Sequence, residues 1–185
     1  ISSRLQGHPS TDKSLPGIRM ASGSLGQGLS VALGTAETKK LNNDSKIVYS
    51  LHGDGELQEG QIWEAAMYAA AKGIDNLVAT VDYNGRQIDG DVEDVLSLGN
   101  LKQKWQAFGW EVYEMNGHDF DDIKQTFEKI QGALGKGKPI AVLMKTEMGK
   151  GVDFMMGSHK WHGVAPNPEQ LEIALDQLEE TLGDY

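Results

Sequence analysis

The chain has 185 residues, with 23 glycines and no cysteine, and its 17 Lys and Arg against 27 Asp and Glu give a formal net charge of −10. The length suits one domain with its own core, and the absence of cysteine excludes disulfides and cysteine-based zinc sites. Because an acidic chain repels phosphate backbones and no apolar run approaches the roughly 20 residues of a membrane span, we expect neither nucleic acid nor a membrane as a partner.

Helical and extended patterns alternate along the chain. A first helix is expected at Leu25–Leu41, where small residues would allow a neighbouring element to approach closely. Short segments rich in β-branched or aromatic residues predict strands at 47–51, 76–81, 110–115 and 139–144. Helical patterns lie between them at 61–72, 101–108 and 120–134. Strands separated by helices of this length form βαβ units, so we expect one α/β domain over residues 1–185, with helices on both faces of a parallel sheet.

The two ends of the chain carry different signals. The chain begins at Ile1, within a polar stretch, and we interpret the domain as truncated at its N-terminus. Residues 148–167 show no clear period, and we expect an active-site loop there because long irregular connections in compact domains tend to be functional. A C-terminal helix is expected over residues 168–183, where Asn167 can cap it and Pro168 suits its first position.

Oxygen ligands follow two neighbouring strands of the expected sheet. Asp54 stands between Gly53 and Gly55 directly after one strand, and Asn84 follows the next strand, about one βαβ unit later. The carboxyl ends of parallel strands meet at one edge of the sheet, where ligands bind. Carboxylate and amide oxygens suit Mg²⁺ or Ca²⁺, and Mg²⁺ commonly completes its shell with water and phosphates. The pattern therefore predicts a metal ion that links the protein to a diphosphate, which the glycine backbone can approach closely.

These residues allow two other interpretations. Gly-Asp-Gly and Asn-Gly form turns wherever they occur, so each alone is a weak signal, and only their occurrence at adjacent strand ends favours a site. A dinucleotide site is the second alternative, but neither residues 53–58 nor residues 23–28 fit the G-x-G-x-x-G pattern, and the sequence contains no P-loop motif.

Three groups of motifs, in order along the chain, resemble those of transketolases. They are the upstream cofactor segment at 7–9, 15–17 and 23–28, the thiamine diphosphate motif at 53–60, 63–66 and 82–90, and the downstream histidine segment at 160–167. The resemblance is closer to transketolase than to deoxyxylulose phosphate synthase or the 2-oxoacid dehydrogenases. It is closest to the N-terminal, diphosphate-binding half, which some organisms make as a separate polypeptide, and it implies the thiamine diphosphate-binding fold.

The resemblance implies roles at the diphosphate end of the cofactor. Asp54 and Asn84 would bind Mg²⁺ or Ca²⁺ through their side chains, and Arg86 would bind the same ion through its backbone carbonyl. Gly53 and Gly55 would lie against the diphosphate of thiamine diphosphate.

Further residues would act at the reactive end of the cofactor. The carbonyl of Gly23 would accept a hydrogen bond from the aminopyrimidine amino group, and Leu25 would pack on the cofactor. His8 and His162 match histidines that line the cofactor and substrate channel, so we expect both to be catalytic and His162 also to bind the cofactor. Glu59 matches an acidic residue near the subunit contact. Three histidines receive no role from the sequence: His52, His118 and His159.

The resemblance implies one part of an enzyme of the pentose phosphate pathway that transfers a two-carbon ketol unit between sugar phosphates. In the family the activating glutamate and the aromatic pocket for the aminopyrimidine ring come from a second domain across a subunit interface. A C-terminal domain or subunit is therefore the expected partner, in a homodimer or hetero-oligomer, and the isolated chain is expected to be inactive. The absence of cysteine is compatible with a cytoplasmic enzyme.

Two alternative functions stay open at the sequence level. The first is a binding module that holds a diphosphate or nucleotide through a metal ion without catalysis. The second is another thiamine diphosphate enzyme on the same scaffold, such as deoxyxylulose phosphate synthase.

Overall fold

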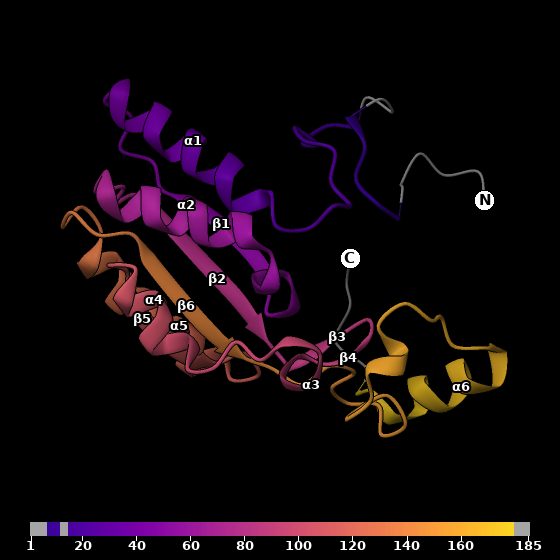
Figure 1. The fold of residues 1–185 in the computed structure, drawn as a ribbon. Helices are drawn as coiled ribbons and strands as arrows, with labels where there is room; N and C mark the ends of the chain where they lie inside the picture. The colour runs from indigo at the N-terminus through magenta and orange to yellow at the C-terminus, as the bar shows by residue number, and fades with distance from the viewer. Residues whose placement is uncertain (1–6, 12–14, 180–185) are drawn as a thin grey trace.

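A computed structural model describes residues 7–11 and 15–179. At its centre four parallel strands pair in the order β1-β2-β6-β5 (Figure 1). The strands are β1 (Val48–Gly53), β2 (Leu77–Tyr83), β6 (Ile140–Lys145) and β5 (Glu111–Asn116). The two central strands, β2 and β6, are the most apolar because both of their faces are buried. The predicted α/β class with a parallel sheet is confirmed.

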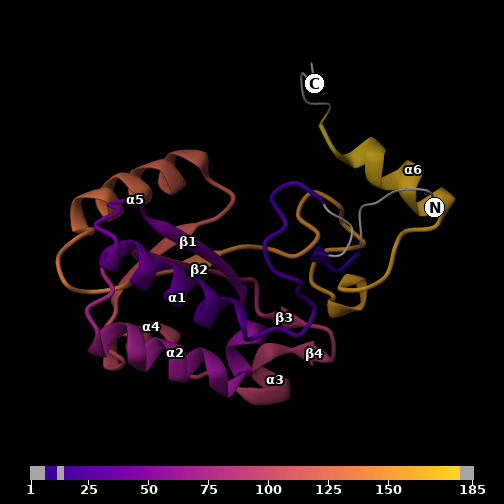
Figure 2. The ribbon, with the colours of Figure 1, turned by 90° about the horizontal axis from the view of Figure 1, so that it is seen from above.

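Helices cover both faces of this sheet. They are α1 (Gly28–Leu41), α2 (Gly60–Ala71), α4 (Leu101–Ala107) and α5 (Phe120–Ala133). The first three share one hydrophobic cluster on one face, and α5 packs with β2, β5 and β6 on the other (Figure 2). Within residues 7–11 and 15–179, no helix is long and apolar enough to cross a lipid bilayer.

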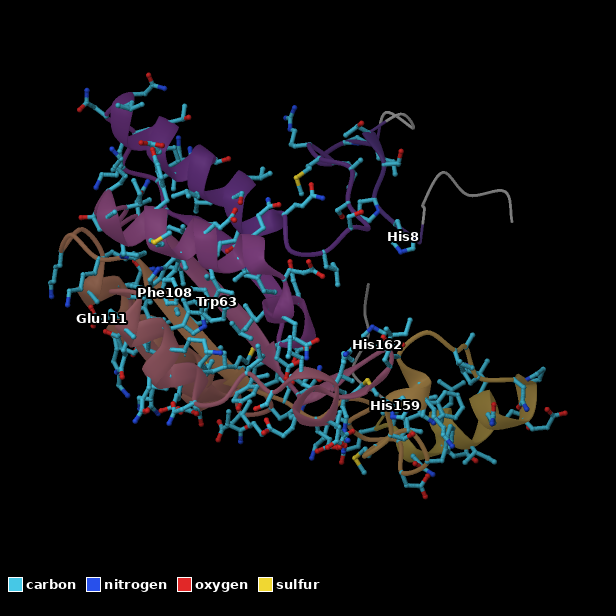
Figure 3. All side chains as sticks on the ribbon, in the orientation of Figure 1. His8, Trp63, Phe108, Glu111, His159 and His162 are labelled. Carbon is cyan, nitrogen blue, oxygen red and sulfur yellow. The ribbon has the colours of Figure 1, made fainter. Side chains whose placement is uncertain are left out.

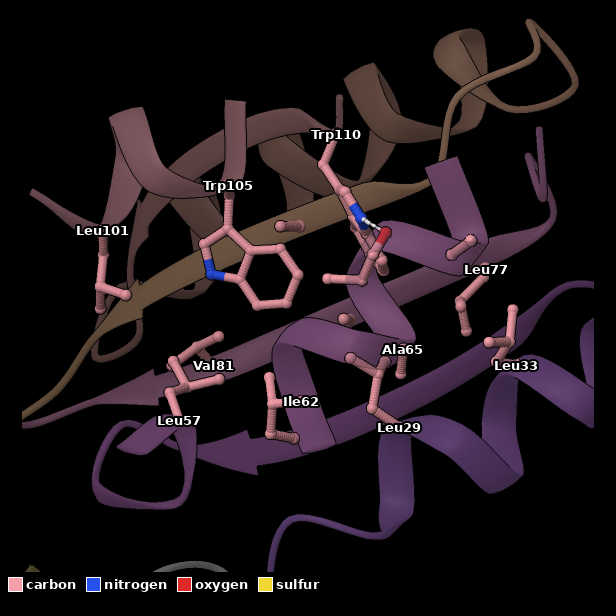
Figure 4. Close-up of a cluster of buried hydrophobic side chains, with 14 of the residues drawn as sticks. Leu29, Leu33, Leu57, Ile62, Ala65, Leu77, Val81, Leu101, Trp105 and Trp110 are labelled. Atoms are coloured by element: carbon pink, nitrogen blue, oxygen red, sulfur yellow. Dashed lines mark hydrogen bonds between the residues drawn. The ribbon is translucent and has the colours of Figure 1, made fainter. Parts of the chain in front are cut away.

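The larger hydrophobic cluster lies between the sheet and the layer formed by α1, α2 and α4. Trp105 of α4 is fully buried, and its ring centroid lies 4.8 Å from that of Trp110. The indole N–H of Trp110 donates to the backbone carbonyl of Ala66 in α2 at 2.9 Å (Figure 4). Side chains of this size dominate core energetics. They join α2 and α4 to the sheet, so the loops at the carboxyl ends of the strands start from a rigid base.

Several short elements gather at the carboxyl ends of the strands (Figure 1). They are the 3₁₀ turn η2 (Gly55–Gln58), the antiparallel pair β3 (Arg86–Gln87) and β4 (Gly90–Asp91), and the short helix α3 (Val92–Leu96). The sequence patterns did not predict β3, β4 or α3, because elements of two to five residues are too short to show a period.

The segment after β6 is irregular apart from one 3₁₀ turn, η3 (His159–Trp161), and it leads into α6 (Pro168–Gln177). The side chain of Asn167 caps α6 in a capping box with Gln170, as residue types at these positions predict. The helix ends at Gln177 and is therefore shorter than expected, and residues 180–183 of the expected helix lie outside the described residues. In both ribbon views α6 lies beyond β3 and β4, away from the sheet (Figures 1 and 2).

Candidate functional site

Asp54 lies at the point where β1 ends and η2 begins, and it is 1% exposed. One carboxylate oxygen, Oδ1, accepts a hydrogen bond from the backbone N–H of Gly55 at 2.9 Å. The other, Oδ2, accepts from the backbone N–H of Gly85 at 2.6 Å. Because Gly85 follows β2, this carboxylate joins the carboxyl ends of two neighbouring strands.

The surroundings of Asp54 disfavour an isolated negative charge. Burial raises the pKa of its carboxyl, the hydrogen bonds from Gly85 and Gly55 act in the opposite direction, and the nearby carboxylate of Asp82 raises it again. The net effect is a raised pKa. A divalent cation at this position would replace the lost hydration and neutralise the carboxylate, so the chemistry of the site fits a metal ion.

Asn84 lies in the turn that follows β2. Its side-chain oxygen accepts the backbone N–H of Arg86 at 2.8 Å, and Gly85 between them has a positive φ of 75°, which glycine adopts without strain. The guanidinium of Arg86 forms a short ion pair with Asp91, which holds β3 against β4. The turn thus places the amide of Asn84 and the backbone of Arg86 beside the residue that Asp54 binds.

These residues line a cavity of about 430 Å³ at the carboxyl edge of the sheet. Of the predicted site residues, its lining includes Leu25, Gly53, Asp54, Gly55, Asn84, Arg86 and His162. A Cβ added at Gly53 would meet nothing within 4 Å, whereas one at Gly55 would lie 2.7 Å from the Cβ of Gln87. Gly53 therefore leaves open space for a ligand, and Gly55 allows the β3 turn to pack closely.

A second cavity, of about 510 Å³, adjoins the first. Its lining includes Gly23, and Leu25 and Glu56 line both cavities. His8 is exposed, and its ring lies against Gly23, where an added Cβ would be 3.3 Å from the His8 Cδ2 atom. Figure 3 shows His8 on the segment before α1 and His162 on the segment after β6. The two predicted histidines thus come from opposite ends of the domain.

Glu56 is a part of the site that the sequence did not reveal. The residue is 9% exposed, and its carboxylate accepts the backbone N–H of Gly26 at 2.9 Å and that of Gly53 at 3.2 Å. Burial by itself raises the pKa of this carboxyl, but the nearby His52 ring and the hydrogen bonds from Gly26 and Gly53 outweigh burial and lower the pKa. The motif around Asp54 contains this glutamate, but nothing in the sequence indicates that it reaches Gly26.

The structure shows the surroundings of the three histidines that received no role from the sequence. His52 is buried in β1, with Nδ1 3.4 Å from Glu56 Oε1 and Nε2 2.9 Å from the hydroxyl oxygen of Ser50. The Nε2 atom of His118 accepts the backbone N–H of Glu147 at 2.8 Å, so His118 fixes the start of the segment that leads to His162. His159 begins η3.

The expected metal ligands are of mixed type, with one carboxylate, one amide and one backbone carbonyl. Among residues 7–11 and 15–179, no three or more His, Cys, Asp or Glu side chains form a group that could hold a metal ion. The predicted set of Asp54, Asn84 and Arg86 contains a single carboxylate, so it does not depend on such a group.

Comparisons with known proteins point to one family. The family model described as "Transketolase, thiamine diphosphate binding domain" matches residues 1–182. The chain is 43% identical over 178 residues to one of the subunits of apulose-4-phosphate transketolase from Phocaeicola vulgatus, and the match covers 96% of this chain and 62% of that relative. It is 42% identical over 163 residues to "6-deoxy-6-sulfo-D-fructose transketolase subunit SqwG" of a Clostridium species, and the match covers 88% of this chain and 58% of that relative.

Solved structures agree with this assignment. The crystal structure of transketolase from Campylobacter jejuni is 35% identical and superposes with a TM-score of 0.84, covering 96% of this chain and 28% of that one. Transketolase from Leishmania mexicana is 27% identical with a TM-score of 0.77, and the match covers 86% of this chain and 25% of that one. The chain therefore corresponds to about a quarter of a full-length transketolase of known structure, and it spans about three fifths of the subunits named above.

Proposed function

Because the chain belongs to the transketolase thiamine diphosphate-binding domain family, we propose that it holds the diphosphate and metal end of that cofactor in a two-carbon ketol transfer between sugar phosphates. One observation carries this proposal. The buried carboxylate of Asp54 binds the backbone of Gly85 and so brings the two predicted ligand-bearing turns together at the edge of one cavity.

The metal ion of the proposal is Mg²⁺ or Ca²⁺. Its ligands are the side chains of Asp54 and Asn84 and the backbone carbonyl of Arg86, which are hard oxygen donors. The raised pKa of Asp54 supports this assignment, since a cation would stabilise the ionised carboxylate. Phosphate oxygens and water would complete the shell, which explains how a chain of net charge −10 can hold a diphosphate.

The chain's own residues bind the cofactor and orient the substrate. Bound thiamine diphosphate supplies the carbanion and the electron sink that C–C cleavage needs. Gly53 leaves room beside the diphosphate, Leu25 packs on the cofactor, and the carbonyl of Gly23 accepts from its amino group. His8 and His162 hold substrate hydroxyls or move protons between them.

The activity needs a second polypeptide or domain. Relatives of this chain are named as individual subunits of transketolases, and we propose a C-terminal partner that carries the activating glutamate, in a dimeric or hetero-oligomeric enzyme of the cytoplasm. Glu59 lies near that contact in the proposal. The isolated chain does not turn over sugar phosphates, because half of the cofactor's surroundings belong to the partner.

Calorimetry of the chain with thiamine diphosphate tests the proposal. We expect binding with Mg²⁺ or Ca²⁺ and none after chelation with EDTA. Asp54→Ala removes the charged metal ligand, and we expect the affinity to fall at least 100-fold, as loss of about 3 kcal/mol implies. Asp89→Ala is the matched control, because Asp89 lines the same cavity but is not among the proposed ligands. Metal-independent binding, or equal binding by the Asp54 variant, contradicts the proposal.

A further inference from the structure

Glu56 joins two loops that are 30 residues apart in the sequence. It stands in η2, directly after the Asp54 turn, while Gly26 lies in the loop that leads into α1. The hydrogen bond from the Gly26 N–H to Glu56 Oε1 measures 2.9 Å and is buried. A carboxylate that accepts a backbone N–H forms a stronger bond than a neutral acceptor does, and burial strengthens it further.

The loop around Gly26 also packs tightly against the same turn. Gly26 has a φ of 89°, and a Cβ added there would lie 2.7 Å from the Cβ of Glu59. Two independent contacts, a hydrogen bond to Glu56 in η2 and the close approach to Glu59 directly after it, thus hold the loop of residues 23–27 against this part of the chain. Both contacts depend on the backbone of a residue that has no side chain.

Glu56 lies between the two cavities, and for this reason its hydrogen bond with Gly26 bears on ligand binding. Leu25 and Glu56 line both cavities, whereas Gly23 lines only one of the two and Asp54 only the other. The second acceptor bond of Glu56, from the N–H of Gly53, reaches the end of β1. Gly53 is also held by its pairing with β2, but Gly26 lies outside the sheet. Loss of Glu56 therefore affects the position of the Gly26 loop more than that of the Asp54 turn.

We propose that Glu56 is a positioning residue that sets the spacing between the Gly23–Leu25 segment and the Asp54 turn, and so between the two ends of the bound cofactor. This inference rests on the proposed function, because the cofactor spans both segments only if that function is correct. His52 supports Glu56 from β1 through its Nδ1 atom, 3.4 Å away, and is itself held by Ser50.

Amide hydrogen exchange of Gly26 tests the tether directly in the unliganded chain. Glu56→Ala removes the acceptor, and we expect the Gly26 amide to exchange about 10-fold faster or more, as loss of a hydrogen bond to a charged group implies. Glu56→Gln keeps a carbonyl oxygen at the same place, so we expect it to restore most of the protection. An unchanged Gly26 exchange rate in Glu56→Ala overturns the inference.

Calorimetry with two ligands tests the consequence for binding. Inorganic pyrophosphate with Mg²⁺ occupies only the Asp54 end, whereas thiamine diphosphate with Mg²⁺ reaches both segments. In Glu56→Ala we expect the affinity for thiamine diphosphate to fall about 10-fold or more and that for pyrophosphate to change by less than about 3-fold. Glu56→Gln keeps an acceptor for the Gly26 N–H but not for the Gly53 N–H, so we expect it to retain most of the wild-type ratio of the two affinities.

Asn76→Ala is the matched control for a general loss of stability. The buried Asn76 side chain also joins distant segments, since its Nδ2 donates to the carbonyl of Ala36 at 3.0 Å, but it lies at the opposite end of the sheet. We expect this variant to leave the ratio of the two affinities unchanged. Equal losses for both ligands in Glu56→Ala overturn the inference but leave the proposed function in place. A wild-type chain that binds pyrophosphate but not thiamine diphosphate contradicts both.

Discussion

Gly117 links β5 to α5 at a point where no side chain fits. A Cβ added there would lie 2.6 Å from side-chain atoms of both Met144 and Thr146 and 3.2 Å from the carbonyl oxygen of Lys145. The backbone N–H of Gly117 donates to that same carbonyl at 2.7 Å. This turn therefore packs directly on the end of β6, beside the start of the segment that carries His162.

Gly117→Ala is expected to lower the free energy of unfolding by about 1–3 kcal/mol, because a methyl group would be forced into occupied space. Gly132→Ala is its control, since Gly132 lies in the last turn of α5 with nothing within 4 Å of an added Cβ. There the same change is expected to stabilise the domain by about 0.5 kcal/mol or less through helix propensity. Urea denaturation of both variants measures the difference, and equal effects of the two changes would contradict the packing seen at Gly117.

At the scale of the elements, the ion pair between Lys40 and Asp75 helps to hold the end of α1 and two connections together at the amino edge of the sheet. The ammonium group of Lys40, in the last turn of α1, lies 2.5 Å from Asp75 Oδ1, in the connection between α2 and β2. The other oxygen of Asp75 accepts the backbone N–H of Gly137, in the connection before β6, at 2.9 Å. Burial of Asp75 raises the pKa of its carboxyl, but the bonds from Lys40 and Gly137 outweigh it, so the pKa is lowered.

A lowered pKa in the folded state gives the pH dependence a definite sign. Asp75 contributes stability above its unfolded pKa, near 3.8, and that contribution is lost as the pH falls through the lower folded value. We expect Asp75→Asn to reduce the free energy of unfolding by about 1–2 kcal/mol at pH 7, and we expect this difference to be smaller at pH 3. Asp176→Asn, at an exposed position on α6, is the control and should stay within about 0.5 kcal/mol at both pH values. A difference that is as large at pH 3 as at pH 7 contradicts the charge-based explanation.

The elements themselves were largely predictable, and their ends were not. The four strands were found because their apolar, β-branched composition is strong, but β1 continues through His52 and Gly53, two residues beyond the end predicted from apolar character. The first helix was expected from Leu25 and begins at Gly28, because Gly26 adopts a left-handed conformation that a helix cannot continue. The pairing of His52 and Gly53 with β2 and the backbone conformation of Gly26 decided these two boundaries, and neither leaves a periodic pattern in the sequence.

The candidate site was also predictable in part. Asp54 and Asn84 were placed at one sheet edge by sequence spacing alone, because parallel topology requires it. Glu56 was missed, since its partner is a backbone N–H and any residue type except proline provides one. The pairing of His118 with the backbone of Glu147 was missed for the same reason.

At the scale of the whole molecule, the sheet, its helix layers and the hydrophobic cluster around Trp105 serve to hold a set of short loops at one edge. The cavity at that edge is lined by residues from both ends of the domain, from Leu25 to His162. An acidic chain that binds a diphosphate must compensate the negative charge of both the protein and the ligand. The proposed metal ion does so where the carboxylate of Asp54 bonds the end of β1 to the turn after β2.

The central claim is that one divalent ion joins this chain to the diphosphate of thiamine diphosphate. The most direct measurement is a crystal structure of the chain with thiamine diphosphate and Mn²⁺, with anomalous data collected at the manganese edge. The account predicts one anomalous peak within about 2.6 Å of side-chain oxygens of both Asp54 and Asn84, in contact with the diphosphate. A cofactor bound elsewhere, or a diphosphate bound in this cavity without an ion at Asp54, would contradict it.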